Sequence, residues 1–125
     1  MKKIFSLLLV IALMFSLCAC KVSLSDEQEQ CCKSADELFS SMAESLNMKF
    51  ESKTEKEDGK ILYVVTLDFD GVIDEGNATT FQQHVMPIAE DILSQEDIYV
   101  VLYLSENGEE VYRIVDSKLD PSILD

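Results

Sequence analysis

The stretch MKFESKTEKEDGKILYVVTLDF, residues 48–69, predicts a β-hairpin that turns at Asp58-Gly59. An Asp-Gly pair between two β-forming runs is a strong signal for a two-residue turn. The residues that then face each other are Met48 and Phe69, Lys49 and Asp68, Phe50 and Leu67, Glu51 and Thr66, Ser52 and Val65, Lys53 and Val64, and Thr54 and Tyr63. One face is apolar and the other is charged or mixed, which is typical of an antiparallel pair covered on one side.

A second hairpin is predicted over residues 97–116, because Asn107-Gly108 is another two-residue turn signal. The predicted facing pairs are Leu104 with Val111, Tyr103 with Tyr112, and Val101 with Ile114.

An amphipathic helix is predicted ahead of the first hairpin, from about residue 26 to Asn47. Its start is ambiguous, because Ser25 with Gln28 and Ser34 with Glu37 could each form a capping box. Helical spacing gives one apolar stripe, made of Cys32, Ala35, Leu38, Phe39, Met42, Ala43 and Leu46.

A second helix is predicted between the hairpins, roughly over residues 78–94, with Asn77, Thr79 or Thr80 as its cap. Its apolar stripe follows helical spacing through Phe81, Val85, Ile88, Ala89 and Ile92. Pro87 lies inside this helix and is expected to kink or split it, because proline removes a backbone hydrogen bond.

The order of elements is therefore α-β-β-α-β-β, which predicts an α+β fold. We expect a two-layer sandwich in which a four-stranded antiparallel sheet carries two helices on one face. Residues 26–118 would form this single domain, and residues 119–125 would form a C-terminal tail.

The N-terminus, MKKIFSLLLVIALMFSLCAC, has the pattern of a secretory signal. Two lysines precede an apolar run of about fourteen residues, which is shorter than the roughly 20 that a spanning helix needs. Leu17-Cys18-Ala19-Cys20 resembles the bacterial lipobox, and Cys20 fits the modified position whereas Cys18 does not. The resemblance implies a signal peptide at residues 1–19, a diacylglyceryl (palmitate-type) lipid on Cys20, a tether at residues 20–25, and a domain anchored on the outer face of the cell membrane. The alternatives are an ordinary cleaved signal or a single anchor helix.

The charge of the chain limits the partners that it can bind. All 24 acidic residues follow Cys20, against eight basic ones, so residues 20–125 carry a net charge of −16. Nucleic-acid binding requires a basic face, and an anionic membrane surface attracts basic segments. We therefore expect neither nucleic acid nor direct contact with headgroups, and any charged partner should be cationic or a metal ion.

The mature chain resembles small secreted lipoproteins of Gram-positive bacteria that carry a domain of unknown function. The resemblance lies in the lipobox and in LFSSMAESLNMKFES, ILYVVTL and IYVVLYLSENGEEVYRI. It implies the same layout and location in the cell envelope, and it brings no known activity.

The acidic stretch LDFDGVID, residues 67–74, suggests two chemistries. It resembles the first motif of haloacid-dehalogenase-type phosphatases, which implies Asp68 as nucleophile, Asp70 as general acid/base and Mg²⁺ between them, and VVLYLS, ending at Ser105, looks like the second motif of that family. Against this, two hairpins do not fit a parallel sheet, and no paired aspartates follow downstream. Alternatively, Asp68, Asp70, Asp74 and Glu75 could bind Ca²⁺, or they could be solvated side chains of an acidic loop.

Three further side chains allow more than one role. Cys31 and Cys32 could be buried as small hydrophobic residues, could form an intermolecular disulfide or could bind a soft metal. A disulfide between them would be strained, because adjacent Cα atoms lie about 3.8 Å apart. His84 has no second histidine or nucleophile near it in sequence and is expected to be structural.

The face of the sheet away from the helices is the predicted functional surface. In the first hairpin it carries Lys49, Glu51, Lys53, Glu55, Leu62, Val64 and Thr66. In the second hairpin it carries either Tyr99, Tyr103 and Tyr112 with Val101 and Ile114, or Leu102, Leu104, Val111 and Arg113. The expected function is a non-enzymatic interaction or envelope-associated domain that docks a protein or glycan partner or a second copy there, unless Ile123 and Leu124 of the tail cover the face. The oligomeric state is left open.

Overall fold

The computed structural model describes residues 23–124, which form the predicted α-β-β-α-β-β order. The predicted signal peptide, the lipidation site Cys20 and the start of the tether lie outside the described residues. The helices and strands are α2 (Asp26–Leu46), β1 (Met48–Glu57), β2 (Lys60–Phe69), α3 (Glu75–Thr80), a π-helical turn (Phe81–Val85), α4 (Met86–Ser94), β3 (Ile98–Glu106), β4 (Glu109–Val115) and a 3₁₀ turn (Pro121–Leu124).

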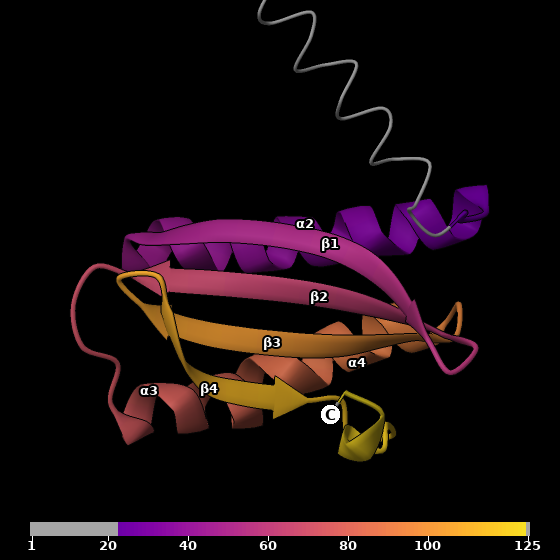
Figure 1. The fold of residues 1–125 in the computed structure, drawn as a ribbon. Coiled ribbons are helices and arrows are strands. Elements are labelled where there is room, and N and C mark those ends of the chain that lie inside the picture. Colours follow the sequence, from indigo (N-terminus) through magenta and orange to yellow (C-terminus); the bar gives the residue numbers. More distant parts are fainter. Residues whose placement is uncertain (1–22, 125) are drawn as a thin grey trace, which may run out of the picture.

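The four strands form one sheet in the order β1-β2-β3-β4, with α2 and α4 packed on the same face (Figure 1). The predicted all-antiparallel sheet is wrong, because the central strands β2 and β3 are parallel. Helical residues 75–94 span about 30 Å at 1.5 Å per residue, which nearly matches the ten residues of β2 at about 3.3 Å each. The helical connection therefore returns the chain to the starting end of β2, and β3 runs in the same direction.

The first hairpin has the register that its turn predicts. Phe50 lies opposite Leu67, Lys49 opposite Asp68, and the other five predicted pairs are also present. Asp58 and Gly59 both have positive φ, of 52° and 78°, as a type I′ turn requires.

The second hairpin differs from its predicted register beyond the turn. Leu104 lies opposite Tyr112, not Val111, because a β-bulge in β4 leaves Val111 without an opposite residue in β3. The bulge shifts the rest of β4 by one residue and so exchanges its two faces. Tyr112 and Ile114 thus turn toward the helices, and Arg113 comes to lie opposite Tyr103.

Helix α2 begins and ends at sequence signals. The Ser25 hydroxyl accepts a hydrogen bond from the Gln28 N–H, and the Gln28 side chain accepts one from the Ser25 N–H, so the capping box at Ser25 is the one that forms. Asn47 ends the helix in the left-handed conformation, as expected. The predicted stripe packs on the sheet through Cys32, Ala35, Phe39 and Ala43, which are all buried.

The second helical segment starts earlier than predicted and contains a π-helical turn. Asp74, not a later residue, caps it by accepting a hydrogen bond from the Asn77 N–H. The π turn precedes Pro87, which has no N–H to donate, and one extra residue in this turn rotates the following helix. Ile88 is consequently 51% exposed, whereas Met86, which the predicted stripe omitted, is buried.

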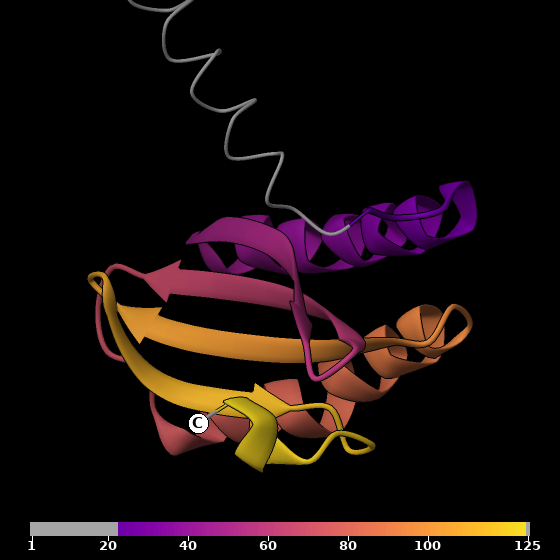
Figure 2. The same ribbon diagram turned by 45° about the vertical axis from the view of Figure 1, so that its right-hand side comes forward.

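Two apolar clusters hold the sheet, one on each face. The larger lies between the sheet and α2, α4 and the π turn. On the opposite face, which we call the open face, Leu62, Val64 and Val101 are buried beneath the C-terminal segment. Figure 2 shows this segment lying in front of the sheet.

The C-terminal segment is part of the fold, since Leu119 is only 5% exposed and Ile123 and Leu124 pack around it. Two alternatives for the open face followed from the sequence, docking of a partner or coverage by Ile123 and Leu124, and the C-terminal segment does cover part of this face. It covers only one end of the open face, around Leu62 and Val101.

We predict that Leu119→Ala lowers the free energy of unfolding by about 2–5 kcal/mol, because it removes buried methyl groups and uncovers the second apolar cluster. Urea unfolding followed by circular dichroism measures this. Val72→Ala, at a side chain that is 78% exposed, is the control and should change stability by less than about 0.5 kcal/mol. Equal effects of the two substitutions would contradict the packing of the C-terminal segment.

Candidate functional site

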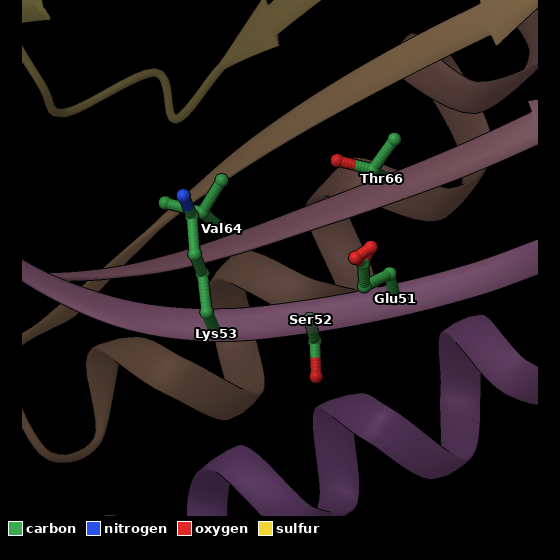
Figure 3. Close-up of a pocket in the computed structure, with 5 residues that line it drawn as sticks. All are labelled: Glu51, Ser52, Lys53, Val64 and Thr66. Atoms are coloured by element: carbon green, nitrogen blue, oxygen red, sulfur yellow. The ribbon is translucent and has the colours of Figure 1, made fainter. Parts of the chain in front are cut away.

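The uncovered part of the open face forms a shallow groove. Its larger section, of about 450 Å³, lies toward the carboxyl ends of β2 and β3 and is lined by Lys49, Phe50, Glu51, Thr66, Asp68, Ser105 and Gly108. A smaller section, of about 150 Å³, shares two of these residues and is lined by Glu51, Ser52, Lys53, Val64 and Thr66 (Figure 3). We call the two sections together the open-face groove.

Strand β1 supplies this groove with alternating charges. Every second residue of a strand lies on the same face, which puts Lys49, Glu51 and Lys53 in one row. Figure 3 shows Glu51, Lys53 and Thr66 pointing to one side of the sheet, while Ser52 points to the other side, toward α2. The groove therefore presents side chains of both signs beside a threonine hydroxyl.

Asp68 closes the groove at the carboxyl end of β2. The parallel register places it opposite Ser105, whose hydroxyl donates a hydrogen bond of 2.6 Å to Asp68 Oδ1, and the Gly108 N–H donates another of 2.7 Å. These two hydrogen bonds, together with the nearby charge of Lys49, hold the pKa of Asp68 below its ordinary value. The carboxylate thus ties β2 to the turn between β3 and β4.

The resemblance to phosphatase motifs pointed to Asp68 and Ser105, and the structure brings these two residues together. Only the central pair of strands is parallel, however, and both outer pairs are antiparallel. Asp70, the expected acid/base, is exposed.

The acidic loop does not gather its carboxylates. Asp74 caps α3, Asp68 binds Ser105 and Gly108, and Glu75 lies in the first turn of α3. Within residues 23–124 no group of three or more His, Cys, Asp or Glu side chains is placed to hold a metal ion.

The two cysteines of α2 form no disulfide among the described residues, and their burial follows the helical stripe. Cys32 is buried and Cys31 is half-buried. Burial, reinforced by the neighbouring Asp36 carboxylate, raises the pKa of Cys32 to about 11. Burial also raises the pKa of Cys31, and the negative charge of Glu96 adds to this rise.

A polar cluster under the sheet was missed in the sequence. Asp36 of α2 accepts hydrogen bonds from the hydroxyls of Tyr63 (2.5 Å) and Ser52 (2.6 Å). Burial and the Asp36 hydrogen bond raise the pKa of Tyr63 above its ordinary value. The signal was a tyrosine on the apolar face of a strand, since a buried phenol needs a hydrogen-bond partner.

The attachment of the C-terminal segment was also missed. The backbone N–H of Asp116 donates a hydrogen bond to the Val100 carbonyl (2.8 Å). The buried carboxylate of Asp116 accepts hydrogen bonds from the backbone N–H groups of Val100 (3.1 Å) and Lys118 (2.9 Å). The Ser117 hydroxyl donates to Glu90 of α4 at 2.6 Å. These contacts fix the chain where it leaves β4 and crosses to the open face.

The remaining predicted side chains are placed by the strand registers. Tyr99 and Tyr103 pack at the border of the open-face cluster, whereas Tyr112 packs on the helix side, so the predicted set of three tyrosines on one face is wrong. The bulge at Val111 is the reason. His84 is exposed in the π-helical turn.

Comparison of the chain with protein-family models, with curated proteins and with solved structures gives no match. No helix within residues 23–124 is both long enough and apolar enough to cross a membrane.

We predict that Asp68→Asn lowers stability at pH 7 and that this loss disappears in acid. The folded pKa lies below the unfolded one, so the charged carboxylate stabilises the fold above the unfolded value and loses that effect as the pH falls through the folded value. Urea midpoints between pH 7 and pH 2.5 measure this. Asp70→Asn, at an exposed side chain, is the control. A difference in urea midpoint between the parent protein and Asp68→Asn that stays constant with pH would contradict a lowered pKa for Asp68.

We predict that Cys32 reacts with iodoacetamide at pH 8 roughly 10- to 100-fold more slowly in the folded protein than in urea, because a pKa of about 11 leaves little thiolate. Cys31 should react faster than Cys32. Mass spectrometry of peptides after timed alkylation separates the two positions. Equal rates in the folded protein would contradict the burial of Cys32.

Proposed function

We propose that this chain is a lipid-anchored, extracytoplasmic binding domain without enzymatic activity, which contacts a protein partner of the cell envelope through the open-face groove. The observation that carries the proposal is the groove itself, with its alternating charges, on a domain preceded in sequence by a stretch that resembles a secretory signal and a lipobox. The resemblance to small Gram-positive lipoproteins supports the same location.

The geometry favours a groove that faces away from the membrane. Ser25 follows Cys20 by five positions in the sequence, a distance of at most about 18 Å in extended chain, so the start of α2 would stay close to the lipid. Helix α2 has 21 residues, or about 30 Å of length. The larger section of the groove lies near Lys49 and Asp68, toward the opposite end of the sheet from the start of α2 (Figure 1).

The side chains of the groove suit a polypeptide that carries charges of both signs. Lys53 Nζ lies 3.0 Å from Glu55 Oε2 in an exposed ion pair. Such a pair contributes only about 0–1 kcal/mol to stability, so either side chain can exchange its partner at low cost. The Asp68 carboxylate already accepts two hydrogen bonds within the fold, which favours a structural role over a catalytic one.

The anchor is tested by mass spectrometry of the membrane-fraction protein, which should begin with an acylated Cys20. Cys20→Ser should release the protein into the medium or leave the signal attached. A wild-type protein that is found unacylated in the medium would contradict the anchor.

The groove is tested by photo-cross-linking in intact cells. A photoreactive amino acid at Lys53 or Thr66 should capture one common protein, whereas the same group at the exposed Asp91 of α4 should not. Capture of a glycan instead would change the class of partner. Identical products from all three positions would contradict a role for the groove.

A further inference from the structure

A second groove lies on the outer edge of β4, away from the open-face groove. It encloses about 470 Å³ and is lined by Glu75, Ala78, Thr79, Gln82, Tyr112, Arg113, Ile114, Val115 and Pro121. Four of these residues, 112–115, are consecutive in β4. Side chains alternate between the faces of a strand, so a groove that touches four residues in a row must follow the edge of the strand. We call it the β4 groove.

The backbone of β4 is suited to further pairing along this groove. β4 is an edge strand, with β3 as its only strand neighbour among residues 23–124. The Asp116 N–H donates to the Val100 carbonyl, and backbone groups in an antiparallel pair alternate in direction. The N–H and C=O of Val115 therefore point away from β3, toward the groove.

Helix α3 and the π turn form the other wall of the groove. Glu75, Thr79 and Gln82 are exposed there, and Ala78 gives a small side chain at the base. Figure 1 shows α3 running beside β4. A sheet edge flanked by a helix is the arrangement in which extended peptides add as an extra strand, with backbone hydrogen bonds giving affinity.

The charge around the β4 groove is predominantly negative, although Arg113 lines the groove. Residues 61–112 contain eleven acidic side chains and no lysine or arginine. Of the six lysines within residues 23–124, five lie in α2, in β1 or at the start of β2, and the sixth is Lys118. Glu75 lines the groove itself, Glu109 and Glu110 begin β4, and Arg113 is the basic residue of the lining. The partner that this field attracts is cationic, and a second copy, whose residues 20–125 also carry a net charge of −16, is repelled.

We infer that the β4 groove binds an extended, lysine- or arginine-rich segment of a partner protein as a fifth strand paired with β4. Such a segment would alternate basic residues with small apolar ones, the latter packing toward Ala78 and Ile114. This inference concerns a different surface from the open-face groove, and it stands or falls independently of the proposed function.

The test uses the full chain purified in detergent and labelled peptides of seven residues, the length of β4. One peptide alternates lysine with valine, a second alternates glutamate with valine, and a third carries proline at the centre of the first. Fluorescence anisotropy measures each dissociation constant. The lysine peptide should bind at least about tenfold more tightly than either of the others. Absence of binding up to about 1 mM, or equal binding of the proline peptide, would overturn the inference.

Two pairs of variants locate the binding site. Glu75→Lys and Asp91→Lys change the net charge equally on exposed helical positions, and only Glu75→Lys should weaken binding of the lysine peptide, by about fivefold or more. Val115→Pro removes one outward N–H, which an edge strand tolerates, and should weaken binding, while Val115→Ala retains that N–H and should weaken binding less than Val115→Pro does. Equal losses for Glu75→Lys and Asp91→Lys would show attraction by net charge alone and would overturn the inference. A parent protein that forms dimers, together with a Val115→Pro variant that does not, would also overturn the inference. The edge of β4 would then pair with a second copy of the chain.

Discussion

The parallel pairing of β2 with β3 is the constraint on which the rest of the structure depends. It follows from a helical connection, Glu75–Ser94, that is nearly as long as β2 and brings the chain back to the same end of the sheet. Each hairpin then extends outward from this pair, so β1 and β4 become the edges. The same register places Asp68 beside Ser105, and the hydrogen bond between them fixes the carboxyl ends of both strands.

The two central strands are apolar on both faces over their first halves, and both faces are covered there. Continuous runs such as Ile61–Val65 are typical of parallel strands buried on two sides. The helices cover one face, and Leu119 with the residues after it covers one end of the other. Asp116 and Glu90 hold this C-terminal segment where it leaves β4. What stays accessible is the polar end of the open face and the edge of β4, and these are the two surfaces to which we assign binding.

Local sequence signals predicted the helices and strands well. Features that depend on several elements at once, such as strand direction, were predicted less well. The Asp58-Gly59 turn was sufficient for the register of the first hairpin, and Asn47 for the end of α2, whereas the two candidate capping boxes left the start of α2 open. The predicted register of the second hairpin was wrong by one residue, because no residue type in the sequence indicates the bulge at Val111. The face of α4 was wrong because the π turn before Pro87 adds a residue that simple helical periodicity does not contain. The direction of β3 relative to β2 depends on the length of the whole connection, and the hairpin signals do not encode it. At the candidate site, the row of lysine and glutamate on β1 was predicted, whereas the contacts of Asp36 and Asp116 depend on tertiary packing.

The most direct test of this account is a set of nuclear Overhauser contacts between the backbones of β2 and β3 in isotope-labelled protein. Parallel pairing predicts inter-strand contacts that follow Val64 with Val101 and Thr66 with Tyr103, with both sequences advancing together. Contacts that advance along β2 while they recede along β3 would show an antiparallel pair. Such a result would contradict the central claim, since Asp68 would then lie far from Ser105 and β4 would not be placed as the edge beside α3.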